Sequence, residues 1–402
     1  MKLRTKRIDI EQYLLIYLCM LNTSSKMLKM FQDQIIVFTF LVCTVLMIIG
    51  KVKLKNSYFG WIAVLFLWIF VQHVALQGNI SILSVANLLS KYLVAYCAVA
   101  IRPKKFVECF VKTICFFAGV SLLFYCVSFT PVSSVMKVIL ITNNDSCWVG
   151  NVSYGRLLYH YMPGYTRNVG IFNEPGVYQL FLNVALFFTL FKRNELCLSD
   201  RKYSVSIAIL VLSVITAAST AGYITMIILI MGYVFSLRKA WGTKKVGVII
   251  TILIALGIFI QTDLFNEVFA EKLLLSSDEI FANGTGNARV ASILLDLQYI
   301  RNNIWGNGYS SSWVNTSTIA TFETGSSVGL TSMVNVYGVP ISTLIYCLYI
   351  WAFKKCSSTN TEFVILLLMF ISSFLSQPWI LTPVYLVIFS YAFFHNINRS
   401  EV

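Results

Sequence analysis

Long apolar runs separated by short basic segments dominate this chain of 402 residues and decide what it can fold into. Each run is near the ~20 residues that an α-helix needs to cross ~30 Å of hydrocarbon. We place the runs near residues 9–23, 34–50, 57–76, 81–101, 106–130, 170–191, 203–218, 221–237, 246–262, 328–353, 363–378 and 382–396. Only 12% of the residues are charged, against about 25% in a soluble protein. The sequence therefore predicts an all-α, polytopic integral membrane protein with about 12 transmembrane helices, forming a single membrane domain over residues 1–402.

The net charge of +14 is explained by the membrane topology. If the N-terminus is inside and the runs alternate, 21 of the 31 basic residues fall in the inner segments and 8 in the outer ones. Basic residues are enriched in cytoplasmic loops, so both termini are predicted to be cytoplasmic. The basic residues form no continuous stripe, which excludes a nucleic-acid partner.

Two connections are long, and both lie on the outer side: Pro131–Val169 and Asp263–Ser327. Long loops in a compact protein are usually functional. A simple transporter tends instead to keep its polar chemistry at the membrane midplane, in broken helices. We therefore expect the chemistry of this protein at the outer membrane face.

The first long loop gathers aromatic rings around two arginines. Arg156 and Arg167 accompany His160, Tyr161 and Tyr165. Aromatic faces stack on sugar rings, and guanidinium groups hold phosphate in two-point contacts. The aromatic residues alone are also typical of the interfacial belt of any membrane protein. The arginines favour a binding function, because arginine is scarce on the outer side.

The second long loop contains two amphipathic helical patterns. DLFNEVFAEKLLL is typical of a helix that lies on the bilayer surface. In GNARVASILLDLQYIRNN, Leu294 and Leu297 share an apolar side, while Arg289, Ser292 and Asp296 share a polar side. The loop is therefore predicted to contain short helices with Arg289 and Asp296 on one face.

Polar residues also occur within the apolar runs. Lys91 lies in the middle of a predicted span, too deep to reach the interface easily. It is expected either to contact an anionic lipid group or to pair with a helix carbonyl. Glu108 and Lys112 are four residues apart at a predicted inner end, which indicates a structural ion pair.

Three segments resemble the O-antigen polymerase (Wzy-type) and O-antigen ligase families of bacterial polysaccharide assembly. They are RNVGIFNEPGVYQLFLNVALFF, TAASTAGYITMIILIMGY and ARVASILLDLQYIRNNIWGNGYSS, and the last leads through GLTSMVNVYGVP into a span. Together with the loop placement, the resemblance covers most of Arg102–Pro383.

The resemblance implies a GT-C-like glycosyltransferase in the bacterial inner membrane, with two long periplasmic loops. Its donor would be a glycan on undecaprenyl pyrophosphate, and its acceptor one repeat unit on the same lipid. No cofactor is implied, because the pyrophosphate bond already holds the energy. Membrane lipid and a chain-length regulator protein are the other expected partners.

The same resemblance implies roles for individual side chains. Arg167 and Arg289 match the outer-loop arginines of the family and would stabilise the leaving pyrophosphate. Glu174 and Glu323 are the candidate carboxylates for catalysis, although Glu174 precedes a span and also suits a helix cap. The remaining candidates are predicted to bind substrate: Arg156, His160, Tyr161, Tyr165, Asp296, Arg301 and Lys91.

One departure from the family bears on the choice between its members. O-antigen ligases carry a histidine just before the span that begins here near Val328, and this chain has GSSVGLTSM there. The ligase is therefore disfavoured, and the general base is left unassigned. A lipid-linked oligosaccharide flippase is the rival from another class, and the two long outer loops argue against it.

Overall fold

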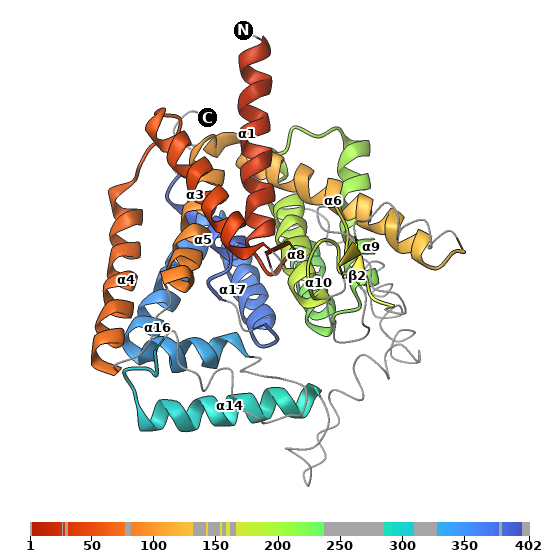
Figure 1. The fold of residues 1–402 in the computed structure, drawn as a ribbon. Coiled ribbons are helices and arrows are strands. Elements are labelled where there is room, and N and C mark those ends of the chain that lie inside the picture. Colours follow the sequence, from red (N-terminus) through yellow and green to blue (C-terminus); the bar gives the residue numbers. More distant parts are fainter. Residues whose placement is uncertain are drawn as a thin grey trace. The chain divides into compact units, whose positions relative to one another are not determined.

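The computed structural model of the chain consists of two compact units, which are described separately (Figure 1). The described residues are 2–25, 27–28, 31–76, 82–131, 142–143, 153–154, 158–160, 166–236, 285–308, 328–377 and 380–395. Unit 1 comprises Met1–Asn56, Leu83–Met226 and Leu381–Val402, and unit 2 comprises Ser57–Ile82 and Ile227–Ile380. That the two units form the single membrane domain expected from the sequence stays a prediction.

Unit 1 is built around a completely buried helix. Its described α-helices are α1 (Lys2–Leu21), α3 (Gln32–Ile48), α5 (Ile82–Ala100), α6 (Phe106–Ser128), α8 (Pro175–Phe191), α9 (Asp200–Ala217), the first part of α10 (Thr220–Ser236) and α18 (Pro383–Ala392). Two short 3₁₀ helices, η1 (Pro103–Lys105) and η2 (Arg193–Glu195), and a two-residue antiparallel pair, β1 (Thr142–Asn143) with β2 (Ser153–Tyr154), complete it. Every residue of α8 from Pro175 to Leu190 is buried. The aromatic rings of Phe106, Phe110, Phe188 and Tyr391 pack together beside it.

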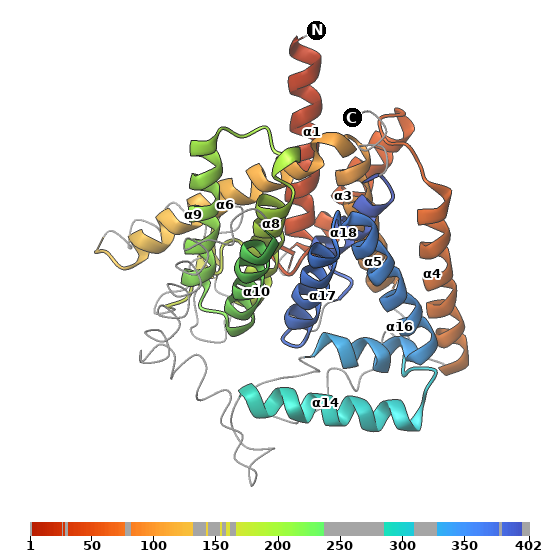
Figure 2. The same ribbon diagram turned by 180° about the vertical axis from the view of Figure 1, so that it is seen from behind.

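Unit 2 has four complete α-helices in its described part. They are α4 (Asn56–Leu76), α14 (Thr285–Asn302), α16 (Gly329–Cys356) and α17 (Asn360–Phe374). In both views α14 runs alongside the first part of α16 and across the direction of α4 (Figures 1 and 2). The second helical pattern of the long loop is thus confirmed as a helix.

Each predicted apolar run except 246–262 contains a described α-helix, although the run 170–191 becomes helical only at Pro175, and the run 246–262 lies outside the described residues. Four helices within the described residues are long and apolar enough to cross a membrane: α4, α5, η1 with α6, and α16. Helix α4 exposes large apolar side chains, with Leu67, Phe70 and Val74 each more than 60% exposed. Water disfavours such a surface and hydrocarbon favours it, so these helices fit a membrane-embedded protein.

Contacts within unit 1 agree with the alternation predicted from the charges. At the predicted inner ends, Lys51 forms an ion pair with Glu11, and the Tyr96 hydroxyl donates to the Lys53 carbonyl at 2.5 Å. At the predicted outer ends, the Tyr125 hydroxyl donates to the Thr166 carbonyl at 2.8 Å. Segments predicted for the same side therefore meet, while the face that is cytoplasmic stays a prediction.

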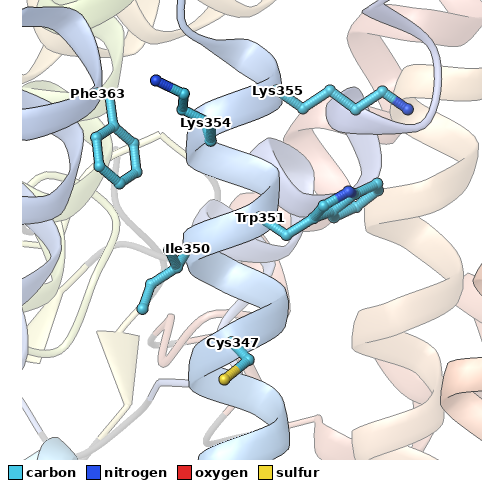
Figure 3. A pocket seen from close by; sticks show the side chains of 6 residues that line it. All are labelled: Cys347, Ile350, Trp351, Lys354, Lys355 and Phe363. Atoms are coloured by element: carbon cyan, nitrogen blue, oxygen red, sulfur yellow. The ribbon is translucent and has the colours of Figure 1, made fainter. Parts of the chain in front are cut away.

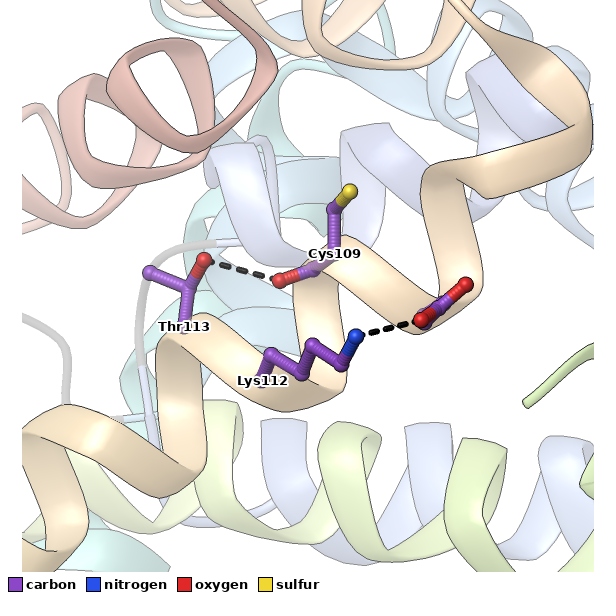
Figure 4. Close-up of polar contacts among 4 residues, drawn as sticks. Cys109, Lys112 and Thr113 are labelled. Carbon is purple, nitrogen blue, oxygen red and sulfur yellow. Dashed lines mark hydrogen bonds and ion pairs between the residues drawn. The ribbon is translucent and has the colours of Figure 1, made fainter. Parts of the chain in front are cut away.

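The predicted pair on α6 is confirmed (Figure 4). Lys112 forms an ion pair with Glu108 one turn earlier, and Thr113 donates from its Oγ1 to the Cys109 carbonyl at 2.8 Å. These local bonds satisfy polar side chains along an apolar helix without involving another element.

Two predicted spans differ from the observed helices. Helix α18 has 10 residues, about 15 Å of helix. Pro383 sets its start, because it occupies the first turn and keeps Thr382 extended, and the helix ends at Ala392, where the Phe393 N–H bonds the Ser390 carbonyl in a tighter turn. The predicted span 382–396 was therefore too long for the helix observed. Helix α16 is broken at Gly338, where φ is 83° and Pro340 follows, so it consists of two segments.

Candidate functional site

Arg167 lies in the turn before α8, and its neighbour Asn168 anchors that turn. Asn168 is fully buried. Its backbone N–H donates to the Thr216 carbonyl at 2.9 Å, and its Nδ2 donates to Ser121 Oγ at 3.1 Å and Thr216 Oγ1 at 3.2 Å. Arg167 itself is half-buried. The turn thus holds a guanidinium at the predicted outer end of unit 1.

A left-handed glycine completes this turn. Gly170 has φ of 58°, and its N–H donates to Asn168 Oδ1 at 3.1 Å. A Cβ on Gly170 would lie 3.0 Å from the Tyr178 ring, so a side chain there would push the turn away from α8. The Tyr178 hydroxyl bonds Ser121 Oγ at 2.6 Å, which joins this ring to the Asn168 network.

The small-residue segment TAASTAG forms a hairpin between α9 and α10. Ala218 ends α9 in the left-handed conformation, with φ of 48°. Gly222 lets α10 approach α8 so closely that a Cβ on it would lie 3.0 Å from Gln179. Small residues allow such backbone approach between membrane helices, and the hairpin in turn supplies Thr216 to the Asn168 network.

Glu174 is the N-cap residue of α8, directly before Pro175. Glu174 is exposed. The structure gives its side chain no capping hydrogen bond at the start of α8. The catalytic role itself stays a prediction.

His160 braces the same turn from inside the protein. It is 2% exposed, and its ring Nδ1 bonds the Phe172 carbonyl at 2.9 Å. Its backbone N–H donates to the Gly170 carbonyl at 2.6 Å. His160 is therefore buried and bonded to the turn before α8, and its contact with substrate stays a prediction.

In unit 2, α14 buries its polar side and exposes its apolar side. Ser292 and Asp296 are 3% and 1% exposed, whereas Leu294 and Leu297 are 48% and 51% exposed. This is the reverse of a helix on a water-soluble protein. Arg289 lies on the buried polar side, two turns before Asp296, and is half-buried.

Asp296 connects α14 to α16 through both carboxylate oxygens. Thr331 Oγ1 donates to Oδ2 at 2.6 Å, and Asn335 Nδ2 donates to Oδ1 at 2.8 Å. Asn307, beyond the end of α14, donates from its Nδ2 to Asn335 Oδ1 at 2.6 Å. Asp296 therefore fixes the register of the helix that carries Arg289, while its predicted role in substrate binding stays a prediction.

Residues 305–308, with the sequence WGNG, pack against the break in α16. Gly306 and Gly338 both have positive φ, and a Cβ on Gly306 would lie 2.4 Å from the Gly338 nitrogen. Gln72 of α4 donates from Nε2 to the Trp305 carbonyl at 2.7 Å, and Trp68 donates from Nε1 to the Tyr337 carbonyl at 2.7 Å. Gln72 was not predicted from the sequence to make this contact, although a lone amide in an apolar span indicates such a hydrogen bond.

The other predicted site residues are less closely tied to these two networks. Arg301 is exposed at the end of α14. Lys91 is half-buried in the middle of α5. Arg156, Tyr161, Tyr165 and Glu323 lie outside the described residues.

Arg167 and Arg289 belong to different units, each with its own buried support. Among the described residues, no group of three or more His, Cys, Asp and Glu side chains could hold a metal ion. Comparison of the chain with protein-family models and with curated proteins gives no match. The chemistry of these side chains is therefore the basis of any functional proposal.

Proposed function

We propose that the protein polymerises undecaprenyl-pyrophosphate-linked oligosaccharide repeat units into O-antigen or a related polysaccharide. It would act as a GT-C-like enzyme at the periplasmic face of the bacterial inner membrane, with both termini in the cytoplasm. The observation that carries the proposal is the support given to Arg167 and Arg289. Each stands beside a buried polar network, through Asn168 in one case and Asp296 in the other.

The reaction needs cations where charge develops. The terminal sugar hydroxyl of the repeat unit attacks the anomeric carbon of the donor and forms the new C–O bond. The bond from that carbon to the pyrophosphate oxygen breaks, and its electron pair leaves with the lipid pyrophosphate. Guanidinium groups at the leaving group favour the transition state over the ground state, because the charge there increases as the bond breaks. Arg167 and Arg289 have this role in the proposal.

The acceptor hydroxyl must also lose its proton to a base. Glu174 suits this role best among the described candidates, because its carboxylate is exposed and makes no capping bond. It also lies seven residues from Arg167 in the same turn. Glu323 is the second candidate from the sequence.

The test uses a deletion strain complemented with single variants. Wild type is expected to restore long polysaccharide chains, whereas R167A and R289A leave lipid A–core bearing one repeat unit. Loss of one preorganised donor reduces the rate by about 10²–10³-fold, and R167K and R289K are expected to recover only part of it, because lysine lacks the two-point geometry. Arg201→Ala is the matched control, since Arg201 is exposed and lies in a predicted inner segment.

The outcomes separate the rival functions. Long chains made by R167A or R289A at normal protein levels would refute the role of these arginines. A deletion strain that lacks even single-unit capping would favour the flippase or the ligase. The flippase has one observation in its favour, since half-buried Lys91 lies within α5, where a transported anion could meet it.

A further inference from the structure

An apolar pocket opens at the predicted inner end of α16, far along the chain from the arginine-bearing segments. Its volume is about 490 Å³, and it is lined by Cys347, Ile350, Trp351, Lys354, Lys355 and Phe363. Figure 3 shows five of these side chains on α16, with Phe363 on the neighbouring helix. Ile350 and Trp351 are 43% and 39% exposed. The lining follows α16 over the nine residues from Cys347 to Lys355, a rise of about 12 Å, and suits a hydrocarbon chain.

Two ammonium groups stand at one end of this pocket. Lys354 Nζ lies 5.4 Å from the centre of the Phe363 ring, and Lys355 Nζ lies 5.0 Å from that of Trp351. Lys354 also donates to Asn360 Oδ1 at 2.7 Å. Among the described residues neither ammonium has a carboxylate partner. The aromatic contacts hold both lysines beside the pocket.

The local charge is positive. Glu362 is the one acidic residue of α16 and α17, and it is 7% exposed. Its Oε2 accepts from the backbone N–H of Ser358 at 2.8 Å, so it serves the start of α17. An occupant with an apolar chain and an anionic head is complementary to this combination of an apolar wall and two cations that flank its end.

We propose that this pocket binds one anionic phospholipid, with an acyl chain along Cys347, Ile350 and Trp351 and its phosphate at the end of the pocket that Lys354 and Lys355 flank from either side. The site is separate from the polymerase chemistry and does not depend on it. Basic pockets between membrane helices on the cytoplasmic side bind lipid headgroups in this way. Since a juxtamembrane lysine contributes about 1 kcal/mol, each one is expected to raise the relative affinity roughly fivefold.

Tryptophan quenching by brominated lipid tests the site on the full-length protein. The purified chain is reconstituted in phosphatidylcholine vesicles that contain increasing fractions of brominated phosphatidylglycerol or brominated phosphatidylcholine. The chain has eight tryptophans, so the pocket signal is the difference between wild type and Trp351→Phe. We expect this signal to be quenched at lower fractions of the anionic lipid than of the neutral one.

Charge variants identify the groups responsible. K354Q/K355Q is expected to abolish the preference for the anionic lipid. K104Q/K105Q is the matched control, because it removes the same charge from another pair of exposed lysines in a predicted inner segment, and it should keep the preference. The Trp351 signal of each charge variant is its difference from the same variant that also carries Trp351→Phe, and the preference is the ratio of this signal between the two lipids. Loss of the contact between Lys355 and Trp351 therefore does not bias the comparison. Equal quenching of wild type by both lipids, a preference that survives in K354Q/K355Q, or one lost equally in the control would overturn the proposal.

Discussion

The segments that carry Arg167 and Arg289 present the same chemical group by different means. Arg167 belongs to an irregular turn, which the amide of Asn168 fastens to Ser121 and Thr216. Arg289 belongs to a helix, and a buried carboxylate two turns away sets the rotation of that helix. In the turn the anchor is the next residue along the chain, whereas in the helix it is seven residues away.

This difference predicts how each region responds to mutation. A turn held by one amide should tolerate changes that keep the amide bonds and fail locally when they are lost. A helix held through register should fail as a unit, because its turn at Gly306 and its anchor at Asp296 both connect it to α16. The predictions below test this contrast.

The largest effect is expected at the interlocked glycines of unit 2. Gly306→Ala puts a Cβ 2.4 Å from the Gly338 nitrogen at a φ of 91°. The left-handed conformation and the overpacking together should destabilise the protein by more than about 3 kcal/mol. Thermal unfolding of the purified protein in detergent measures this loss.

Gly60→Ala is the control for this substitution. A Cβ on Gly60, in α4 of the same unit, meets no atom within 4 Å, and alanine is the better helix former. We expect unchanged or slightly raised stability. If Gly306→Ala is as stable as Gly60→Ala, the interlock of the two glycines is wrong.

The anchor of α14 should be the next most sensitive position. In Asp296→Asn, the carboxylate becomes a neutral amide, and the amide nitrogen that replaces one oxygen no longer accepts a hydrogen bond from Thr331 or Asn335. Hydrogen bonds to charged groups contribute about 1.5–3 kcal/mol, so we expect a loss of this order. Asp200→Asn removes only an exposed ion pair with Arg193, so it should cost about 0–1 kcal/mol. Full stability of Asp296→Asn with impaired polymerisation would instead indicate direct contact with substrate.

These two regions also show what a single sequence reveals. The 3.6-residue period predicts α14 and groups Arg289 with Asp296 correctly, because periodicity is a local property. It does not tell which face is buried, since a membrane can reverse the rule that holds in water. The bond between Asp296 and Asn335 joins residues 39 apart, and the contact of Gly306 with Gly338 joins two separate motifs. Such pairings depend on tertiary structure, so the sequence supplies the parts of the site without their partners.

The turn of unit 1 should lose less stability and lose it locally. Asn168→Ala removes the two side-chain bonds to Ser121 and Thr216 and the acceptor for Gly170 N–H. We expect a loss of about 1–2 kcal/mol and a fall in polymerisation, because Arg167 is no longer fixed. Thr216→Val keeps the backbone bond of Asn168 and should have a smaller effect on both. A chain-length pattern in Asn168→Ala that matches wild type would show that the turn does not position Arg167.

The smallest effect on stability is expected at Glu174. A change in activity at this position would therefore not arise from unfolding. Glu174 and Thr359 are both extended N-cap residues, but only Thr359 caps its helix through its side chain. Thr359 accepts from the Glu362 N–H at 3.2 Å, whereas Glu174 accepts no capping bond. Thr359→Ala should therefore cost about 1 kcal/mol, and Glu174→Gln should stay within about 0.5 kcal/mol of wild type.

The activity of Glu174→Gln then decides what the carboxylate does. Glutamine keeps the shape and exposure of the side chain but does not accept a proton at neutral pH, so a base at this position predicts arrest at one repeat unit with full stability. Long chains from Glu174→Gln would exclude Glu174 as the base and direct the same substitution to Glu323. A loss of stability equal to that of Thr359→Ala would instead make Glu174 a cap, and its distance from Arg167 in the sequence would then carry no catalytic meaning.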